Sequence, residues 1–253
     1  MKNIFKWTCG LIPALFGNLV VVYFYELLRN FQKLFGKKDW GSFEKNAENL
    51  RQHIEAAVKR NGFIEDQNNF TDVSLGKVTM KYAGCEIFAV YNSLVALGKG
   101  SDALRLFEGR EEKAESGKLE DQDKITSQGK LLANLIRYFE GDGIVLSGAF
   151  GTAPKALFDY FKKLGCNARL VTRERDFEEL AEGSVCMILT MYNDRKDITK
   201  EVHTVSITKQ PEGYVAHNVY CNGKVIGPCK SVTELIGCFN GGKSKGISLI
   251  GIS

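Results

Sequence analysis

The pattern of hydrophobic positions divides the chain into a helical first part and a strand-rich second part. Apolar side chains recur at helical spacing over residues 43–60, 87–97 and 153–164, which predicts three helices. After residue 165 the apolar segments are short and rich in β-branched and aromatic residues. They predict a short helix over 177–181 and strands over 168–172, 185–192, 202–209, 214–220 and 247–252. Helices followed by strands are typical of an α+β fold.

The helix over 153–164 carries end signals on both sides. Thr152 is a residue type that commonly caps a helix N-terminus, and Pro154 suits the first turn because its missing N–H costs little there. Gly165 is suited to the left-handed residue that ends many helices. We therefore expect this helix to begin after Thr152 and to end at Gly165.

The first 38 residues differ from the rest of the chain. No charged side chain occurs between Thr8 and Tyr25, a length close to that of a membrane-spanning helix, although Pro13, Gly17 and Asn18 weaken the run. Two interpretations fit: a membrane anchor, with association through residues 8–28, or a helix that packs on the protein. Basic residues are more numerous after the run than before it, which favours a cytoplasmic location or the inner face of a membrane.

Composition and charge narrow the class of protein. The chain has 253 residues, 44% hydrophobic and 25% charged, which is typical of a globular protein and not of a disordered one. The net charge of +4 is spread along the chain, whereas a nucleic-acid-binding protein would gather it on one face, so we expect no nucleic-acid partner. Residues 39–253 are expected to form one domain, with a charged insertion at about residues 100–125.

Several patterns match a known motif by letter but not by context. Residues 237–244 fit the phosphate-binding loop, yet a helix is expected before them and a strand after them, the reverse of that motif. Residues 242–246 fit a nucleophile elbow, but no histidine follows. The seven cysteines form no close pairs, which favours a reducing compartment. A zinc site can be drawn from four residues, but it lacks the usual paired spacing, so we expect neither metal nor cofactor; they are His217, Cys221, Cys229 and Cys238.

Three residues form a better candidate site. Cys85 stands at the start of the helix expected over residues 87–97, where the partial positive charge of a helix N-terminus favours a thiolate, although Glu86 opposes this. His203 and Asn218 follow downstream, in strands. A cysteine nucleophile needs a base within hydrogen-bonding reach, and the base needs an orienting group. The order Cys85, His203, Asn218 therefore points to thiol catalysis.

A turn between the two strands places His203 and Asn218 together. Residues 210–213 read as a four-residue β-turn with Pro at the second position and Gly at the fourth. If Gln210 pairs with Gly213, Asn218 pairs with Val205 and lies diagonal to His203 on one face of the sheet. His217 then points to the opposite face, where we expect it to be structural or exposed.

Four segments resemble papain-like cysteine peptidases, and more narrowly the C39-type bacterial subgroup, whose members process bacteriocin leaders or have no assigned role. The resemblance covers roughly residues 76–220. The segments are Gly84-Cys85 with the helix that follows, residues 151–165, residues 178–188, and residues 203–218. It implies a papain-like fold in which N-terminal helices, including the nucleophile helix, pack on a C-terminal antiparallel sheet.

The resemblance also implies a reaction. Cys85 would attack a peptide bond to form a thioester acyl-enzyme, His203 would act as general base and then acid, and Asn218 would orient the imidazole. The backbone N–H of Cys85 would give one oxyanion donor. The substrate would be a peptide or protein.

The chain departs from the family at two positions. Thr79 stands where the family usually has the Gln that supplies the second oxyanion donor, and Glu86-Ile87 replaces a Gly-Pro. A substitute donor would be Tyr82 or a residue near Asn68 or Asn69. Two alternatives therefore stay open beside the peptidase: an inactive papain-like domain that binds a peptide or protein partner, and a membrane-bound interaction protein whose cysteines are only packed.

Overall fold

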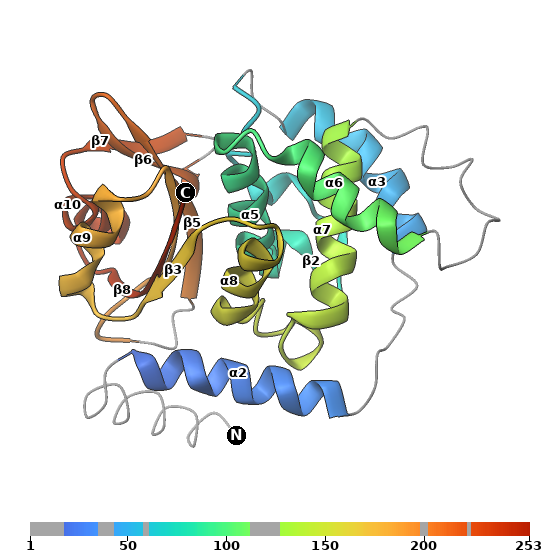
Figure 1. Ribbon diagram of the computed structural model, residues 1–253, viewed down its shortest axis with the longest axis horizontal. Helices are drawn as coiled ribbons and strands as arrows, with labels where there is room; N and C mark the ends of the chain where they lie inside the picture. The colour runs from blue at the N-terminus through green and yellow to red at the C-terminus, as the bar shows by residue number, and fades with distance from the viewer. Residues whose placement is uncertain (1–17, 35–42, 58–60, 112–126, 198–201, 222–223) are drawn as a thin grey trace.

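The computed structural model describes residues 18–34, 43–57, 61–111, 127–197, 202–221 and 224–253. These residues form the expected α+β architecture, with the helices in one half and an antiparallel six-stranded sheet in the other (Figure 1). The boundary expected at residues 38 and 39 lies outside the described residues, as do residues 112–125 of the charged insertion expected at about 100–125.

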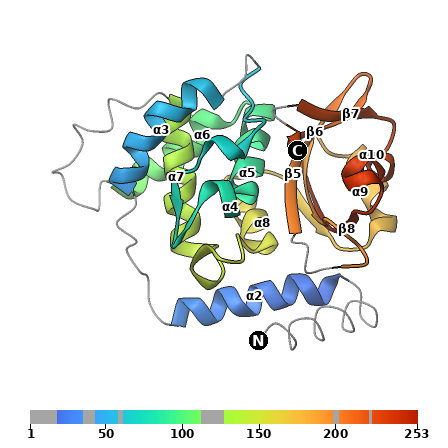
Figure 2. The ribbon, with the colours of Figure 1, turned by 180° about the vertical axis from the view of Figure 1, so that it is seen from behind.

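The helical half is built around α5 (Cys85–Ala96), whose first ten residues are all buried. Seen from either side, the order from the sheet outward is β5, α5, α7, α3 (Figures 1 and 2). A helix in this central position is apolar on most sides, and its buried polar residues are Glu86, Asn92 and Ser93. The other helices here are α3 (Phe43–Ala57), α4 (Met80–Ala83), α6 (Gly100–Glu111), α7 (Ser127–Asp142) and α8 (Pro154–Lys163).

The sheet has the strand order β3-β8-β4-β5-β6-β7, with each neighbouring pair antiparallel. Strand β4 is buried along its whole length because both faces of the sheet are covered. The strands are β3 (Ala168–Val171), β4 (Cys186–Tyr192), β5 (Val202–Gln210), β6 (Gly213–Cys221), β7 (Lys224–Cys229) and β8 (Lys245–Ile252).

The two faces of the sheet bury different cores. Cys186 and Ile188 of β4 face α5 and the helical half, and the Cys186 thiol lies 3.7 Å from the carbonyl oxygen of Ser93. Met187 and Leu189 point the other way, into a second core beneath α9 (Phe177–Glu182) and α10 (Val232–Cys238). This alternation fixes which side chains of β5 can meet α5.

The expected elements are confirmed with small shifts of their ends, and several elements were not anticipated. The expected cap of α8 was wrong: Ala153 is its N-cap, and Thr152 instead forms an isolated bridge with Ile144. Gly165 ends the helix in the left-handed region as predicted. Residues 237–244 span the end of α10 and the turn before β8, so a helix precedes them and a strand follows, as the rejection of the phosphate-loop motif requires. Among the described helices and strands, those not anticipated are α4, α6, α7, β1 (Ser74–Leu75), β2 (Val78–Thr79) and β7.

Helix α2 (Leu19–Leu34) runs beneath both halves of the molecule and packs on α8 and β8 (Figures 1 and 2). Residues 8–17 of the apolar N-terminal run lie outside the described residues. Among the helices that the structure does describe, none has the length and apolar character required to cross a bilayer.

Candidate functional site

Cys85 is the first residue of α5, and a close helix approach fixes it there. Gly84 joins α4 to α5, and a Cβ on this residue would lie 2.4 Å from the carbonyl oxygen of Met80 and 2.8 Å from the ring of Phe88. Only glycine therefore fits between the two helices. The result is a buried thiol at a helix N-terminus, 5% exposed, next to the sheet.

The surroundings of the Cys85 thiol favour its protonated form. The thiol lies 3.3 Å from Oε2 of Glu86, to which it donates. Burial, and after it the neighbouring Glu86 carboxylate, raise the pKa of Cys85 well above its usual value, while the backbone N–H of Thr204 opposes them. The thiolate expected from the helix N-terminus is therefore not the resting form, because loss of water outweighs the helix dipole.

Glu86 is itself a buried acid with an unusual pKa. Burial raises the pKa of its carboxyl to about 7, against hydrogen bonds from Cys85 and from backbone N–H groups, including that of Thr152. A Cβ on Gly151 would come within 2.7 Å of Oε1, so the carboxyl occupies space that only this glycine leaves open. The acid beside the thiol thus changes charge near neutral pH.

His203 lies near the start of β5 and is 1% exposed. Its Nε2 lies 2.8 Å from the backbone oxygen of Asn218. A carbonyl oxygen only accepts, so Nε2 carries the hydrogen and Nδ1 carries the lone pair in the neutral ring. Burial lowers the pKa of His203 to about 4, against the effect of the Asn218 carbonyl, so the ring is neutral at physiological pH.

The register predicted for the β5–β6 hairpin is confirmed from Gln210↔Gly213 to Ser206↔His217. The pairing stops there, because Asn218 has a φ of 61° and turns β6 out of register. The side chain of Asn218 therefore points to Gln67, from whose backbone N–H it accepts (3.0 Å) and to whose Oε1 it donates (2.8 Å). Asn218 contacts His203 through its backbone oxygen. The expectation that the side-chain amide of Asn218 makes this contact was wrong.

A segment missed by the sequence analysis holds Asn218 in this conformation. Glu65 accepts from the backbone N–H of Asn218 at 3.1 Å, and its other oxygen lies 2.7 Å from Nδ1 of His217. The Gln67 amide also donates to the backbone oxygen of Lys81, just before α5. Glu65 and Gln67 are about 150 residues away from His217 and Asn218 in the sequence, so no local pattern indicates these contacts. His217 is structural and buried, and the alternative that it is exposed was wrong.

The structure brings the three predicted residues to one region without joining them in one chain of hydrogen bonds. Within the described part of the chain, the polar partners of the Cys85 thiol are Glu86 and the N–H of Thr204, the residue next to His203. Thr204 shares its face with Thr190 and α5, whereas the side chain of His203 leaves the opposite side of the strand. Cys85 thus contacts β5 at Thr204, whereas the side chain of the adjacent His203 projects from the other face of the strand.

The substitute oxyanion donors named from the sequence are either exposed or bonded to neighbouring residues of their own segment. Tyr82 is 60% exposed. The side-chain amides of Asn68 and Asn69 donate to Asp66, within the short 3-10 helix Gln67–Asn69 and its cap. Thr79 ends strand β2 (Val78–Thr79). The backbone N–H of Cys85, the other donor named from the sequence, lies in the first residue of α5.

The residues drawn as a zinc site fall into separate contacts. His217 lies between Glu65 and the hydroxyl of Thr208, while Cys229 lies beside Cys238 with the two sulfurs 3.8 Å apart. Among the described residues, no group of three or more His, Cys, Asp or Glu side chains is arranged to hold a metal ion.

Comparisons with protein-family models, with curated proteins and with solved structures find no match to this chain.

Proposed function

We propose that the protein is a cysteine peptidase, papain-like and of the C39 type, whose thiol rests in the protonated state. The observation that carries the proposal is that the thiol of Cys85 contacts β5 at the residue next to the imidazole of His203. The Cys85 thiol faces the N–H of Thr204, and the neighbouring His203 is bonded to Asn218. A neutral imidazole with its lone pair on Nδ1 is the form that accepts a thiol proton.

The reaction begins with the thiol leaving Glu86. As Sγ of Cys85 attacks the carbonyl carbon of a peptide bond, the N–H of Cys85 stabilises the oxyanion, and the His203 ring turns round the end of β5 so that its Nδ1 takes the thiol proton. Collapse of the intermediate breaks the C–N bond and passes the proton to the leaving amine, which leaves a thioester. Water then attacks the thioester, with His203 again as base, and the carboxylic acid product and the free thiol are released.

Glu86 gives this site a pH-dependent brake. Its carboxylate beside Cys85 disfavours a second negative charge on sulfur, and its pKa of about 7 places the change near neutrality. While the Cys85 thiol donates its hydrogen bond to the Glu86 carboxylate, its proton is not available to His203. Substrate must therefore displace the thiol from Glu86 before attack. A general-base mechanism with a protonated thiol fits these surroundings better than a preformed thiolate–imidazolium pair.

The test is cleavage of a diverse peptide mixture by the full-length protein, read by mass spectrometry. We expect discrete cleavages in the wild type and in Cys238→Ala, a matched control that removes an exposed thiol. Cys85→Ala and His203→Ala should lose at least ~10³-fold of the rate. Circular dichroism spectra would verify that each variant is folded. Equal cleavage by Cys85→Ala would overturn the proposal.

A second candidate function is peptide binding without turnover, and the position of Gln67 favours it. The amide of this buried glutamine donates to the backbone oxygen of Lys81 and accepts from Asn218, so these two bonds hold it in the scaffold around Asn218. Wild-type protein that binds peptides without cleaving them, and whose affinity survives Cys85→Ala, would establish this function instead.

A further inference from the structure

Helix α2 presents a row of large apolar side chains away from the protein. They recur every three or four residues, so they share one face of the helix. Each is between 47% and 81% exposed. The helix has 16 residues, so the row is about 24 Å long. We call this row the apolar stripe; it consists of Leu19, Tyr23, Leu27, Phe31 and Leu34.

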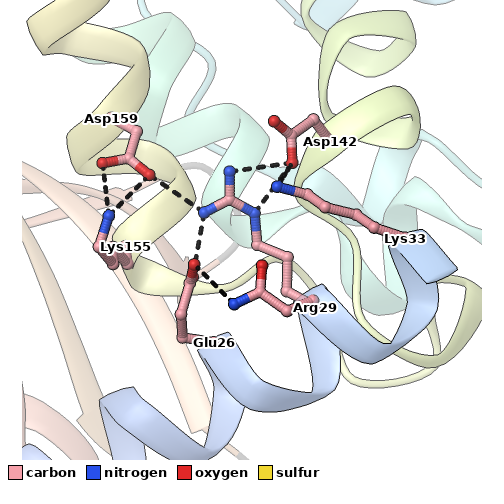
Figure 3. A network of polar contacts seen from close by, with 7 residues as sticks. Glu26, Arg29, Lys33, Asp142, Lys155 and Asp159 are labelled. Carbon is pink, nitrogen blue, oxygen red and sulfur yellow. Dashed lines mark hydrogen bonds and ion pairs between the residues drawn. The ribbon is translucent and has the colours of Figure 1, made fainter.

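The opposite side of α2 is fixed to the protein by buried charge. Arg29, 5% exposed, bonds to Asp142 (2.9 Å), Asp159 (3.1 Å) and Glu26 (3.0 Å), and Lys33 lies 2.6 Å from Asp142 (Figure 3). Figure 3 shows the guanidinium pointing from α2 toward the two aspartates, which come from α7 and α8.

Apolar and polar contacts at the N-terminal end complete the attachment. The side-chain amide of Asn18 donates to the backbone oxygen of Gly246 at 2.8 Å. Val22 is buried with Tyr192 and Ile247 in a third, small core. A helix held at both ends in this way cannot roll to bury the apolar stripe, so the stripe is a fixed feature of the surface.

This arrangement is unusual for a helix on the surface of a globular protein. Such a helix normally turns a polar face outward, because water solvates polar side chains and not apolar ones. Here the buried cation of the helix, Arg29, points into the protein. The outward face carries the apolar stripe. A contiguous apolar face of this kind marks a site that contacts another apolar phase.

The charges around α2 favour a lipid surface over a protein partner. Lys37 and Lys38 follow α2 in the sequence, and Lys2 and Lys6 precede the uncharged run over residues 8–25. Basic residues at both ends of an apolar segment are typical of helices that lie in the headgroup region of anionic membranes. A second copy of the same helix would bring like charges together.

We propose that α2 binds the surface of an anionic membrane, lying in its plane with the apolar stripe in the headgroup–acyl boundary. The Arg29 network then acts as the rigid link between the membrane and the domain. This inference does not rest on the proposed peptidase function, because neither Cys85 nor His203 takes part in it.

The test is flotation of the full-length protein with vesicles of neutral phosphatidylcholine alone or with added phosphatidylglycerol. The stripe variant, Tyr23→Ser with Leu27→Ser and Phe31→Ser, removes the exposed apolar face. The matched control, Tyr82→Ser with Val225→Ser, removes exposed apolar side chains elsewhere. We expect the wild type and the control to float with anionic vesicles, more weakly at high salt. The bound-to-free ratio of the stripe variant should fall at least ~10-fold.

A spectroscopic readout separates loss of binding from loss of folding. Tryptophan at an exposed stripe position, in Tyr23→Trp, should show blue-shifted emission and quenching by brominated lipid when anionic vesicles are added. Tyr82→Trp should not. Equal response of the two variants would overturn the proposal.

Three other outcomes would also overturn it. Flotation of the stripe variant equal to that of wild type would show that the stripe does not contact lipid. A wild-type dimer that becomes monomeric in the stripe variant, without vesicle binding, would assign the stripe to a second copy. Vesicle binding that appears only after deletion of residues 2–17 would assign the stripe in the intact protein to this chain's own N-terminal segment.

Discussion

Two buried glutamates lie on either side of the candidate site, and their surroundings differ. Glu65 is 2% exposed, and each of its oxygens meets a nitrogen, from His217 and from the backbone of Asn218. Glu86 is 6% exposed, and its side-chain partner is a thiol, a weak donor. Burial raises the pKa of Glu86 to about 7.

The difference between the two shows how a fold separates structure from chemistry. A carboxylate with strong nitrogen donors ties distant strands together. A carboxylate left with a thiol and backbone groups is poorly compensated for the loss of water, so it changes charge within the physiological range. Glu65 therefore builds the scaffold that holds Asn218, while Glu86 tunes Cys85.

The largest effect should follow from removing the structural glutamate. Glu65→Ala leaves the ring of His217 and the backbone N–H of Asn218 buried without their acceptor. We expect the free energy of unfolding to fall by about 3–5 kcal/mol, measured by urea denaturation. Glu65→Gln, which keeps the volume and one acceptor, should lose less. A loss below ~1 kcal/mol in the alanine variant would show that Glu65 is not structural.

The next largest effect is the pH dependence that Glu86 creates. Its pKa is higher in the folded protein, so the folded state holds the proton more tightly than the unfolded state. The stabilisation is complete below pH 4.5 and is lost as the pH rises through about 7. The decline should reach about 3 kcal/mol by pH 8. Glu86→Gln should remove it.

Urea denaturation of both proteins at pH 5 and pH 8 measures this difference. His203 has a lowered pKa and so acts in the opposite direction, with stability rising between about pH 4 and 6.5, but it does so in both proteins. Glu212→Gln, at the exposed hairpin turn, is the matched control and should behave as wild type. A pH slope unchanged in Glu86→Gln would contradict the assignment.

A smaller effect concerns the reactivity of Cys85. Because its pKa lies well above the usual value and its thiol is buried, alkylation at pH 8 should be at least ~10-fold slower than that of the exposed Cys238. Glu86→Gln should speed the reaction of Cys85 and leave Cys238 unchanged. Residue-resolved mass spectrometry follows both thiols in one sample. If Cys85 instead reacts first, with an apparent pKa below ~8.5, the thiolate–imidazolium pair exists at rest.

The smallest effect tests the backbone that Glu65 supports. Asn218→Ala and Asn218→Gly both lose the bonds to Gln67, but glycine adopts a φ of 61° without strain. We expect the glycine variant to be more stable than the alanine variant by about 1 kcal/mol in urea denaturation. The reverse order would show that the left-handed conformation is not required.

Most of the secondary structure could be predicted because its signals are local. The spacing of apolar residues gave α3, α5 and α8, and the turn over residues 210–213 fixed the register of β5 and β6. Helix α7 also has such a signal, with Leu131, Leu135 and Phe139 on one face, so the sequence contains enough information to predict it. Strand β7 has none, since it is mostly exposed and contains a Gly-Pro pair.

The start of α5 at Cys85 and the placement of His203 and Asn218 on neighbouring strands could be predicted. The geometry between the three side chains could not. A single residue at positive φ, Asn218, ends the strand pairing and turns its amide toward Gln67. Hydrophobic periodicity describes faces and carries no information on such a turn. The protonated state of Cys85 also depends on burial, which the helix position alone does not reveal.

Most of the elements, the α+β class and the register of the β5–β6 hairpin could be read from the chain, because each depends on signals between residues that are near one another in the sequence. Which buried groups meet depends on the folded arrangement: Glu65 with His217, Gln67 with Asn218, and Arg29 with Asp142. These partners are between 113 and 152 residues apart. Hydrogen bonds and pKa values depend on distance in space and on exclusion of water, and both are set only when the chain has folded.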